Sequence, residues 1–201
     1  MRGLLGVLSL AAVAFASVPA HAVIINTFDG SAGQQRSDFL AALPPTAIVV
    51  NEDLNDNVWD GATISFVGGG HTGLGVAGGK FGDRITTTNS TVIDYARPIL
   101  AFGADWFMSD ANNNSLGLII NTDSGPVPVE VPNSHAFDFF GFISDTPFSQ
   151  IILTGGTQGG PVEEYMVDDV VTAQPIPIPA PGILLAGVAI AGLAAGRLRR
   201  K

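Results

Sequence analysis

Short apolar runs separated by glycine, asparagine and aspartate dominate the sequence from residue 24 to residue 173. Runs of this length that are rich in β-branched and aromatic residues indicate strands, and the residues between them favour turns. Clear turn signals are Gly68–Gly70, Asp123–Gly125 and Gly155-Gly156. The predicted strands are Ala47–Asn51, Ala62–Val67, Arg84–Tyr95, Ile99–Met108, Ser115–Asn121, Val127–Val131, Ala136–Ile143, Ser149–Leu153 and Glu164–Thr172.

One short helix is predicted over Ser37–Leu43, with Ser37 as its N-cap and Pro44-Pro45 as its stop. The pattern shows no alternation of strands with helices, so a parallel α/β sheet is not indicated. Many short strands joined by glycine and asparagine turns are typical of antiparallel sandwiches. The sequence therefore predicts a mainly β protein, a single jelly-roll-like β-sandwich spanning residues 23–173.

The first 22 residues have the pattern of a secretory signal peptide. A basic start at Arg2 precedes the uncharged apolar run Leu4–Ala16, and Ala20 and Ala22 supply small residues before a cleavage point. The alternative is a buried N-terminal helix. The signal peptide predicts export through the Sec machinery, with a mature chain that starts at Val23.

The last 28 residues combine a proline spacer, an apolar run and a basic tip. Residues 174–181 carry four prolines in alternation, which favour an extended spacer. Residues 182–196 have no charged or polar side chain and are predicted to form a transmembrane-like helix. This helix would span only about 22 Å of a hydrocarbon core near 30 Å, and Ala180-Pro181 together with a snorkelling Arg197 would extend its reach. Basic residues follow over 197–201, and they predict a cytoplasmic stop: Arg197, Arg199, Arg200 and Lys201. The alternative is a buried core helix with a basic cap.

This ending resembles the sorting tail of the PEP-CTERM family of exported proteins. The family's motif is matched by Pro179-Ala180-Pro181 followed by Gly182, with Pro177–Pro179 as a second register, and the usual glutamate between the prolines is absent. The resemblance implies recognition by an exosortase-like membrane protease and cleavage near the motif. It implies an inner-membrane-tethered intermediate, then delivery to the cell surface or the extracellular matrix, where exopolysaccharide is a partner.

The resemblance extends more loosely into the domain. Three stretches are similar to parts of the β-sandwich domains that precede such tails: Arg97–Phe107, Phe139–Leu153 and Tyr165–Val171. The last stretch resembles a closing strand of jelly-roll modules of the carbohydrate-binding type.

The domain itself is acidic and has no cysteine, so an exported chain must rely on an ordinary core. All eighteen carboxylates lie between Asp29 and Asp169, and only four cations oppose them, giving this part a net charge of −14. Nucleic-acid binding needs basic patches, so this surface argues against it. It suits divalent cations or neutral polar partners such as glycans.

Oxygen ligands are dense in Asn51–Gly61, and hard cations such as Ca²⁺ take six to eight of them. An EF-hand is excluded because Val58 and Ile64 stand where glycine and glutamate are needed. A calcium site of another type, with Asp53 as a ligand, remains a candidate in this segment. Asp29 with Asp168 and Asp169 is a second candidate set, expected to meet at one structural Ca²⁺ if the first and last strands lie close together. The alternative is turn chemistry, in which these side chains bond their own backbone. No other cofactor is expected.

Enzyme signatures are missing from the sequence, and we expect a protein without catalytic residues. The glycine run Gly73–Gly78 fits GxGxxG, but the glycines that follow it oppose the helix that a dinucleotide site requires, so a flexible surface loop is predicted. A glycan hydrolase that uses an unidentified carboxylate pair remains an alternative. A second alternative is a permanently membrane-anchored binding protein.

Aromatic residues offer one further indication of function, because sugar rings stack on exposed aromatic faces. Trp59 lies in the polar segment and is the predicted glycan contact, with a loop anchor as the alternative. Trp106 and the phenylalanines of 139–148 are predicted to fill the core.

Overall fold

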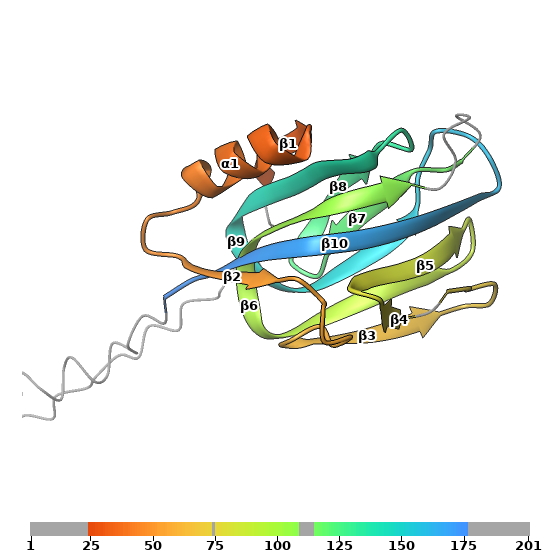
Figure 1. The fold of residues 1–201 in the computed structure, drawn as a ribbon, viewed down its shortest axis with the longest axis horizontal. Helices are drawn as coiled ribbons and strands as arrows, with labels where there is room; N and C mark the ends of the chain where they lie inside the picture. The colour runs from red at the N-terminus through yellow and green to blue at the C-terminus, as the bar shows by residue number, and fades with distance from the viewer. Residues whose placement is uncertain (1–23, 74, 109–114, 177–201) are drawn as a thin grey trace, which may run out of the picture.

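The computed structural model describes residues 24–73, 75–108 and 115–176. Within these ranges, one helix accompanies ten strands that are joined in a single antiparallel sheet (Figure 1). The same ranges hold no helix that is long and apolar enough to cross a membrane. The predicted signal peptide with Ala20 and Ala22, the sorting motif at 179–182, the apolar run and the basic tip all lie outside the described residues.

The elements follow one another in this order: β1 (Ile24–Gly30), α1 (Ala32–Ala42), β2 (Ile48–Glu52), β3 (Ala62–Val67), β4 (Gly75–Ala77), β5 (Lys80–Thr86), β6 (Ser90–Met108), β7 (Leu118–Thr122), β8 (Gly125–Val131), β9 (Ala136–Gly155) and β10 (Val162–Gln174).

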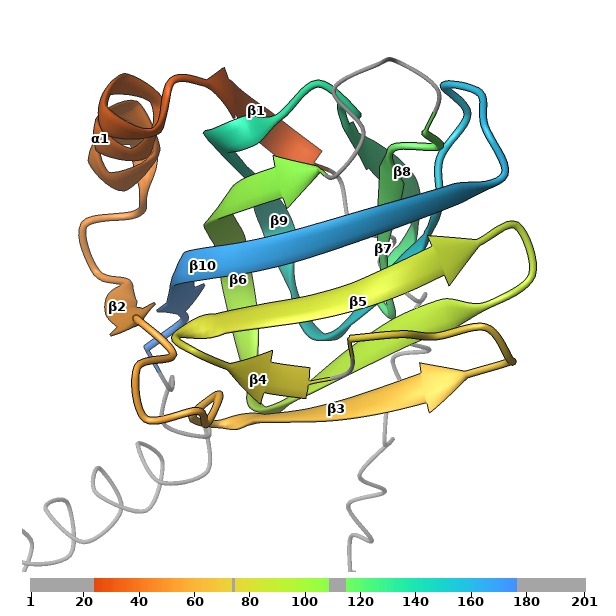
Figure 2. The ribbon, with the colours of Figure 1, turned by 45° about the vertical axis from the view of Figure 1, so that its right-hand side comes forward.

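The long strands β6 and β9 bend and divide the sheet into two layers. In one layer, residues 99–108 of β6 pair with residues 136–143 of β9. This part of β6 also pairs with β10, and this part of β9 also pairs with β1. β10 pairs in turn with β2 and β5. This is layer A, and β4 forms one of its edges. The other halves of β6 and β9, 90–94 and 150–155, pair with each other, with β3 and with β7, and β8 completes layer B. Figure 2 shows β4, β5 and β10 side by side.

The main core lies between the layers and explains the alternation along the strands. On β6, Phe102, Ala104 and Trp106 point inward and are fully buried, and Trp106 donates its indole N–H to the Phe140 carbonyl at 3.2 Å. Phe142 and Phe148 stack in the same core. The core roles predicted for Trp106 and these phenylalanines are confirmed, because period-2 alternation places every second residue on the inner face.

A second, smaller core lies on the outer face of layer A, under α1. Phe39 of the helix packs against Phe139 at 5.3 Å between ring centroids, and Ala101 and Ile143 complete the contact. Phe139 needs room to lie flat, and Gly103 supplies it: a Cβ there would stand 2.4 Å from the Phe139 ring. The helix is thus attached through a few side chains, and Phe139 among them lies over Gly103, which we call the glycine seat.

The prediction of a mainly β fold with one helix is confirmed, while several boundaries differ. The helix begins five residues before Ser37, because its polar first turns carry little apolar periodicity and only Phe39 is buried. The predicted break around Asp145–Pro147 is extended strand, where β9 passes from one layer to the other. β1 was not predicted, and β10 includes Gln174, the first residue of the predicted spacer.

Candidate functional site

Helix α1 covers only part of the outer face of layer A. Along β6 the outward residues are Ala101, Gly103, Asp105 and Phe107. Ala101 is buried under the helix, and Asp105 lies 3.0 Å from the guanidinium of Arg36, at the border of the helix. Burial raises the pKa of Asp105 although Arg36 opposes the shift. Beyond this border the face is open, and Phe107 is only half buried.

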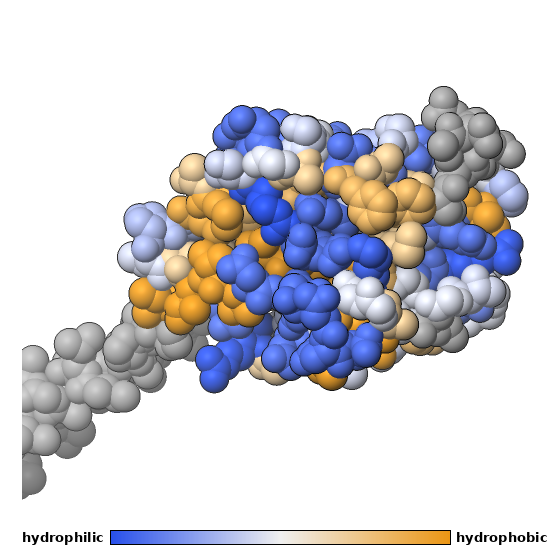
Figure 3. Space-filling model, viewed as in Figure 1, coloured by the Kyte–Doolittle hydropathy of each residue, from blue (hydrophilic) through white to orange (hydrophobic). Residues whose placement is uncertain are grey.

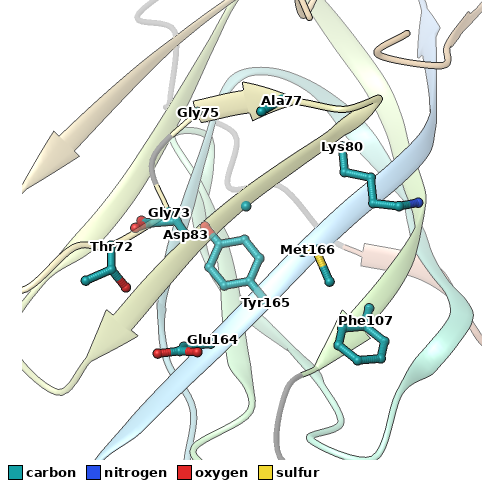
Figure 4. A pocket seen from close by; sticks show the side chains of 11 residues that line it. Thr72, Gly73, Gly75, Ala77, Lys80, Asp83, Phe107, Glu164, Tyr165 and Met166 are labelled. Atoms are coloured by element: carbon teal, nitrogen blue, oxygen red, sulfur yellow. The ribbon is translucent and has the colours of Figure 1, made fainter.

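A groove crosses this open face along one row of paired residues. Gly75, Gly82, Met166 and Phe107 face each other in register across β4, β5, β10 and β6. Because Gly82 has no side chain, the row is hollowed between the β4 turn and Phe107, and a Cβ there would touch Met166 at 3.4 Å. The hollow has a volume of about 280 Å³, at the lower end for small-ligand sites (Figure 4).

Phe137 extends the groove with an exposed aromatic ring. It lies at a bulge where β9 shifts register against β6, and its φ is +66°, a conformation that bulky residues rarely adopt. The bulge places its ring against Phe107, with 4.9 Å between the centroids, and leaves Phe137 46% exposed. Backbone strain of this kind persists only where the surrounding structure holds it, and it is often found at functional sites.

Charged side chains surround the apolar row. The ammonium of Lys80 pairs with Asp168 and lies 5.0 Å from the centre of the Phe137 ring. Glu164 lines the other wall with its side chain 55% exposed, and Arg84 lies 3.8 Å from it. Figure 4 shows Lys80, Met166 and Phe107 projecting from neighbouring strands around the opening. The groove therefore offers aromatic faces flanked by carboxylates and by cationic side chains, all of which can form hydrogen bonds.

A buried polar network supports the groove from below. Asp83 of β5 accepts a hydrogen bond from Thr91 and lies 2.8 Å from Nδ1 of His71. The other nitrogen of His71 lies 3.1 Å from the Val67 carbonyl, so the imidazole joins the β3–β4 connection to the groove strand. Burial raises the pKa of the neighbouring Tyr165 well above 10, which keeps the phenol neutral. This network fixes β5, and with it the position of Lys80 and Gly82.

Trp59 is not part of this groove, and its predicted exposure is wrong. Only 4% of Trp59 is exposed, and its ring meets Phe81 edge-on at 5.6 Å and stacks on Phe102 at 6.5 Å. Its loop folds inward because Leu54 and Asn57 adopt left-handed backbone conformations, which turn Leu54 and Trp59 toward the core. With so little of its surface exposed, Trp59 does not offer an open ring face to a sugar, so the loop-anchor alternative is the correct one.

The four aspartates predicted as cation ligands lie in three places. Asp29 on β1 lies 3.0 Å from Nε2 of His135, and Asp168 faces Lys80 at the groove. Asp53 and Asp169 both line an acidic hollow of about 670 Å³ beside β2. A bulge after Asp168 turns Asp169 away, with a φ of +47°. Asp29, Asp168 and Asp169 therefore do not gather as the second candidate set requires. Around Asp53, as elsewhere in the described ranges, no group of three or more acidic or histidine side chains is placed to hold a metal ion.

Turn chemistry accounts for the oxygen-rich segment. Asp53 accepts a hydrogen bond from the Asn55 amide at 3.1 Å, and Asp56 accepts one from Val58 at 3.0 Å. Hydrogen bonds from Asn55, first of all the one from its backbone amide, lower the pKa of Asp53. Asn57 reaches out of the segment and accepts a bond from the Gly78 amide at 2.9 Å. The segment therefore positions the β4–β5 turn at the edge of the groove.

The glycine run that fits GxGxxG contributes to the groove in a way that the sequence did not reveal. A surface loop was predicted, but Gly75–Ala77 pairs as β4 with Lys80–Gly82, and Gly78 and Gly79 form the turn with positive φ. Phe107 and Phe137 were not singled out either, because alternation alone does not show which outward residues a helix leaves uncovered. The only local signal was that Phe107 and Phe137 occupy outward positions on two predicted strands, Ile99–Met108 and Ala136–Ile143.

Comparisons with known proteins find only distant likenesses. No protein-family model matches the chain, and no curated protein matches it. Among solved structures, the catalytic unit of a thermostable GH87 α-1,3-glucanase from Streptomyces thermodiastaticus strain HF3-3 is similar, with a TM-score of 0.38 and 11% identity over 63% of this chain and 26% of that chain. A family 29 carbohydrate-binding module is similar with a TM-score of 0.34 and 14% identity, over 79% of this chain and 91% of that one. The chain thus spans about a quarter of the glucanase unit and most of the module.

Proposed function

We propose that this chain is a non-enzymatic, exported cell-surface or matrix protein whose jelly-roll-like sandwich binds exopolysaccharide in the groove of layer A. The observation that carries the proposal is Phe137, an exposed ring held beside Phe107 by a strained bulge. Such strain costs about 1–2 kcal/mol and persists where the side chain has a use. A paired aromatic surface in a shallow groove suits the apolar face of a sugar ring.

The charges favour a neutral glycan over an acidic one. Lys80 is paired with Asp168, so its charge is compensated within the protein. Glu164 and the surrounding acidic surface would repel a polyanion, whereas hydroxyl groups can bond both carboxylates and the ammonium. The signal peptide and the sorting tail, with an exosortase-like protease as the processing partner, complete the proposal by delivering the domain to the surface.

The test uses the purified domain and a panel of neutral and acidic polysaccharides in affinity electrophoresis. In gels that contain the glycan bound by the parent, migration of the parent should be slowed. Phe137→Ala and Phe137→Gly should both abolish this retardation. The glycine variant should keep its unfolding free energy within about 1 kcal/mol of the parent, because relief of left-handed strain offsets the lost packing. The alanine variant keeps the strain and should be the less stable of the two.

The control is Leu40→Ala, which removes an apolar side chain that is 40% exposed on α1. Retardation should persist in this variant. Unchanged binding by both Phe137 variants would reject the groove, and release of sugar products by the parent domain would favour the hydrolase alternative.

A further inference from the structure

A second exposed surface lies at the end of layer A, where the described chain stops. Ile48 and Val49 of the edge strand β2 are 47% and 40% exposed, and Ile176 just beyond β10 is 51% exposed. Register places Ile48 beside Gln174 on one face of β2 and Val49 beside Ala173 on the face toward α1, so apolar side chains flank both sides of this edge. Figure 3 shows apolar surface gathered over β2 at this end of the molecule. We call Ile48, Val49 and Ile176 the end patch.

Isolated exposed apolar side chains are ordinary, but a cluster on an edge strand needs a partner. The far side of β2 has no strand paired to it in the described residues, and the neighbouring Ile48 and Val50 line a hollow of about 320 Å³. Exposing apolar side chains to water is unfavourable, so this end favours contact with an apolar phase.

The chemistry of that phase follows from the sequence after the patch. Five residues separate Ile176 from the apolar run that begins at Gly182, and even a fully extended spacer of this length reaches only about 20 Å. A membrane that holds the run would therefore lie within reach of the end patch. The tether would keep the patch at a high local concentration at the lipid surface, so that a small apolar contact suffices.

We propose that the end patch docks on the phospholipid surface while the tail holds the protein in the membrane. This inference rests on the proposed function, and it concerns the membrane-tethered intermediate before the tail is cut. A second copy of the chain is the less favoured occupant, because Glu52, Asp53 and Asp56 adjoin β2 in the acidic hollow and two such surfaces would repel each other. For the same reason zwitterionic lipid should be preferred to anionic lipid.

The experiment exploits the absence of cysteine from the chain, which allows single fluorescent labels. The mature full-length chain carries Ile48→Cys or Pro161→Cys and is reconstituted in phosphatidylcholine vesicles with spin-labelled lipid. Pro161 is exposed and precedes the opposite end of β10, about 40 Å away along a thirteen-residue strand. The label at residue 48 should be quenched about twofold or more relative to the label at residue 161.

A second variant separates the patch from the tether. Val49→Asp together with Ile176→Asp should return the fluorescence at residue 48 to the level of residue 161, while the protein stays in the membrane during carbonate extraction. Equal fluorescence of the two labels in the parent, with the protein retained, would overturn the docking and leave the tether intact. Extraction by carbonate would overturn both. Absence of quenching, together with a disulfide-linked dimer of the unlabelled Ile48→Cys protein under mild oxidation by air, would overturn the docking and assign the patch to self-association.

Discussion

At the residue scale, His135 shows how burial decides the behaviour of a single group. It is 5% exposed beside Asp29, and burial lowers its pKa below 6.5 although Asp29 and Asp138 pull the other way. The sequence showed only a histidine next to a serine, and a partner more than a hundred residues away in the chain could not be inferred from it.

The depressed pKa predicts a loss of stability in mild acid. Unfolding releases a neutral imidazole that takes up a proton below its ordinary pKa of 6.5, so the free energy of unfolding should fall as the pH drops below about 6.5 and level off below the folded pKa. Urea unfolding of the parent and of His135→Gln at pH 7.5 and 5.5 measures this. The pH-dependent fall should be smaller in the variant, and an equal fall in both would assign it to other groups.

At the element scale, strand alternation was visible in the sequence while strand length was not. Trp106 and Phe142 were predicted to fill the core, and they lie there because alternation is a local property of the backbone. Two predicted strands are continuous in β6, and two others are continuous in β9. Each strand stays extended through its bend because β6 and β9 pair with each other on both sides of it. Turn-forming residues such as Asp145 therefore suggested a break that the pairing overrides.

The glycine seat of the helix gives a prediction at this scale. Gly103→Ala should lower the free energy of unfolding by about 2–3 kcal/mol, because the fully buried Phe139 ring stands 2.4 Å from the new Cβ and has nowhere to move. Gly33→Ala in α1 is the matched change with the opposite sign. Its Cβ would meet nothing within 4 Å, and it should stabilise by about 0.5 kcal/mol. Denaturant midpoints measure both, and equal effects at the two sites would contradict the packing described here.

At the scale of the whole molecule, the ends and the domain carry separate parts of the function. The tail prediction is tested by the intact mass of the protein from cells and medium of its native host. A sorted protein should start at Val23 and end near Pro179–Gly182, and Pro179→Ala with Pro181→Ala should block this processing. A parent mass that still includes Lys201 would favour a permanent anchor over exosortase sorting.

The sequence by itself determined the β class, the alternating core positions and the predicted processing signals, because each depends on local composition or on a period of two. Only the tertiary structure decided which aromatic residues are exposed. Trp59 turns inward because of a backbone conformation that the polar composition of its segment does not reveal. Phe137 turns outward at a bulge in the pairing of β9 with β6. The groove exists because α1 covers layer A only as far as the Arg36–Asp105 pair, and because Gly82 lies beside Met166 on the neighbouring strand. Both arrangements depend on contacts between residues far apart in the chain.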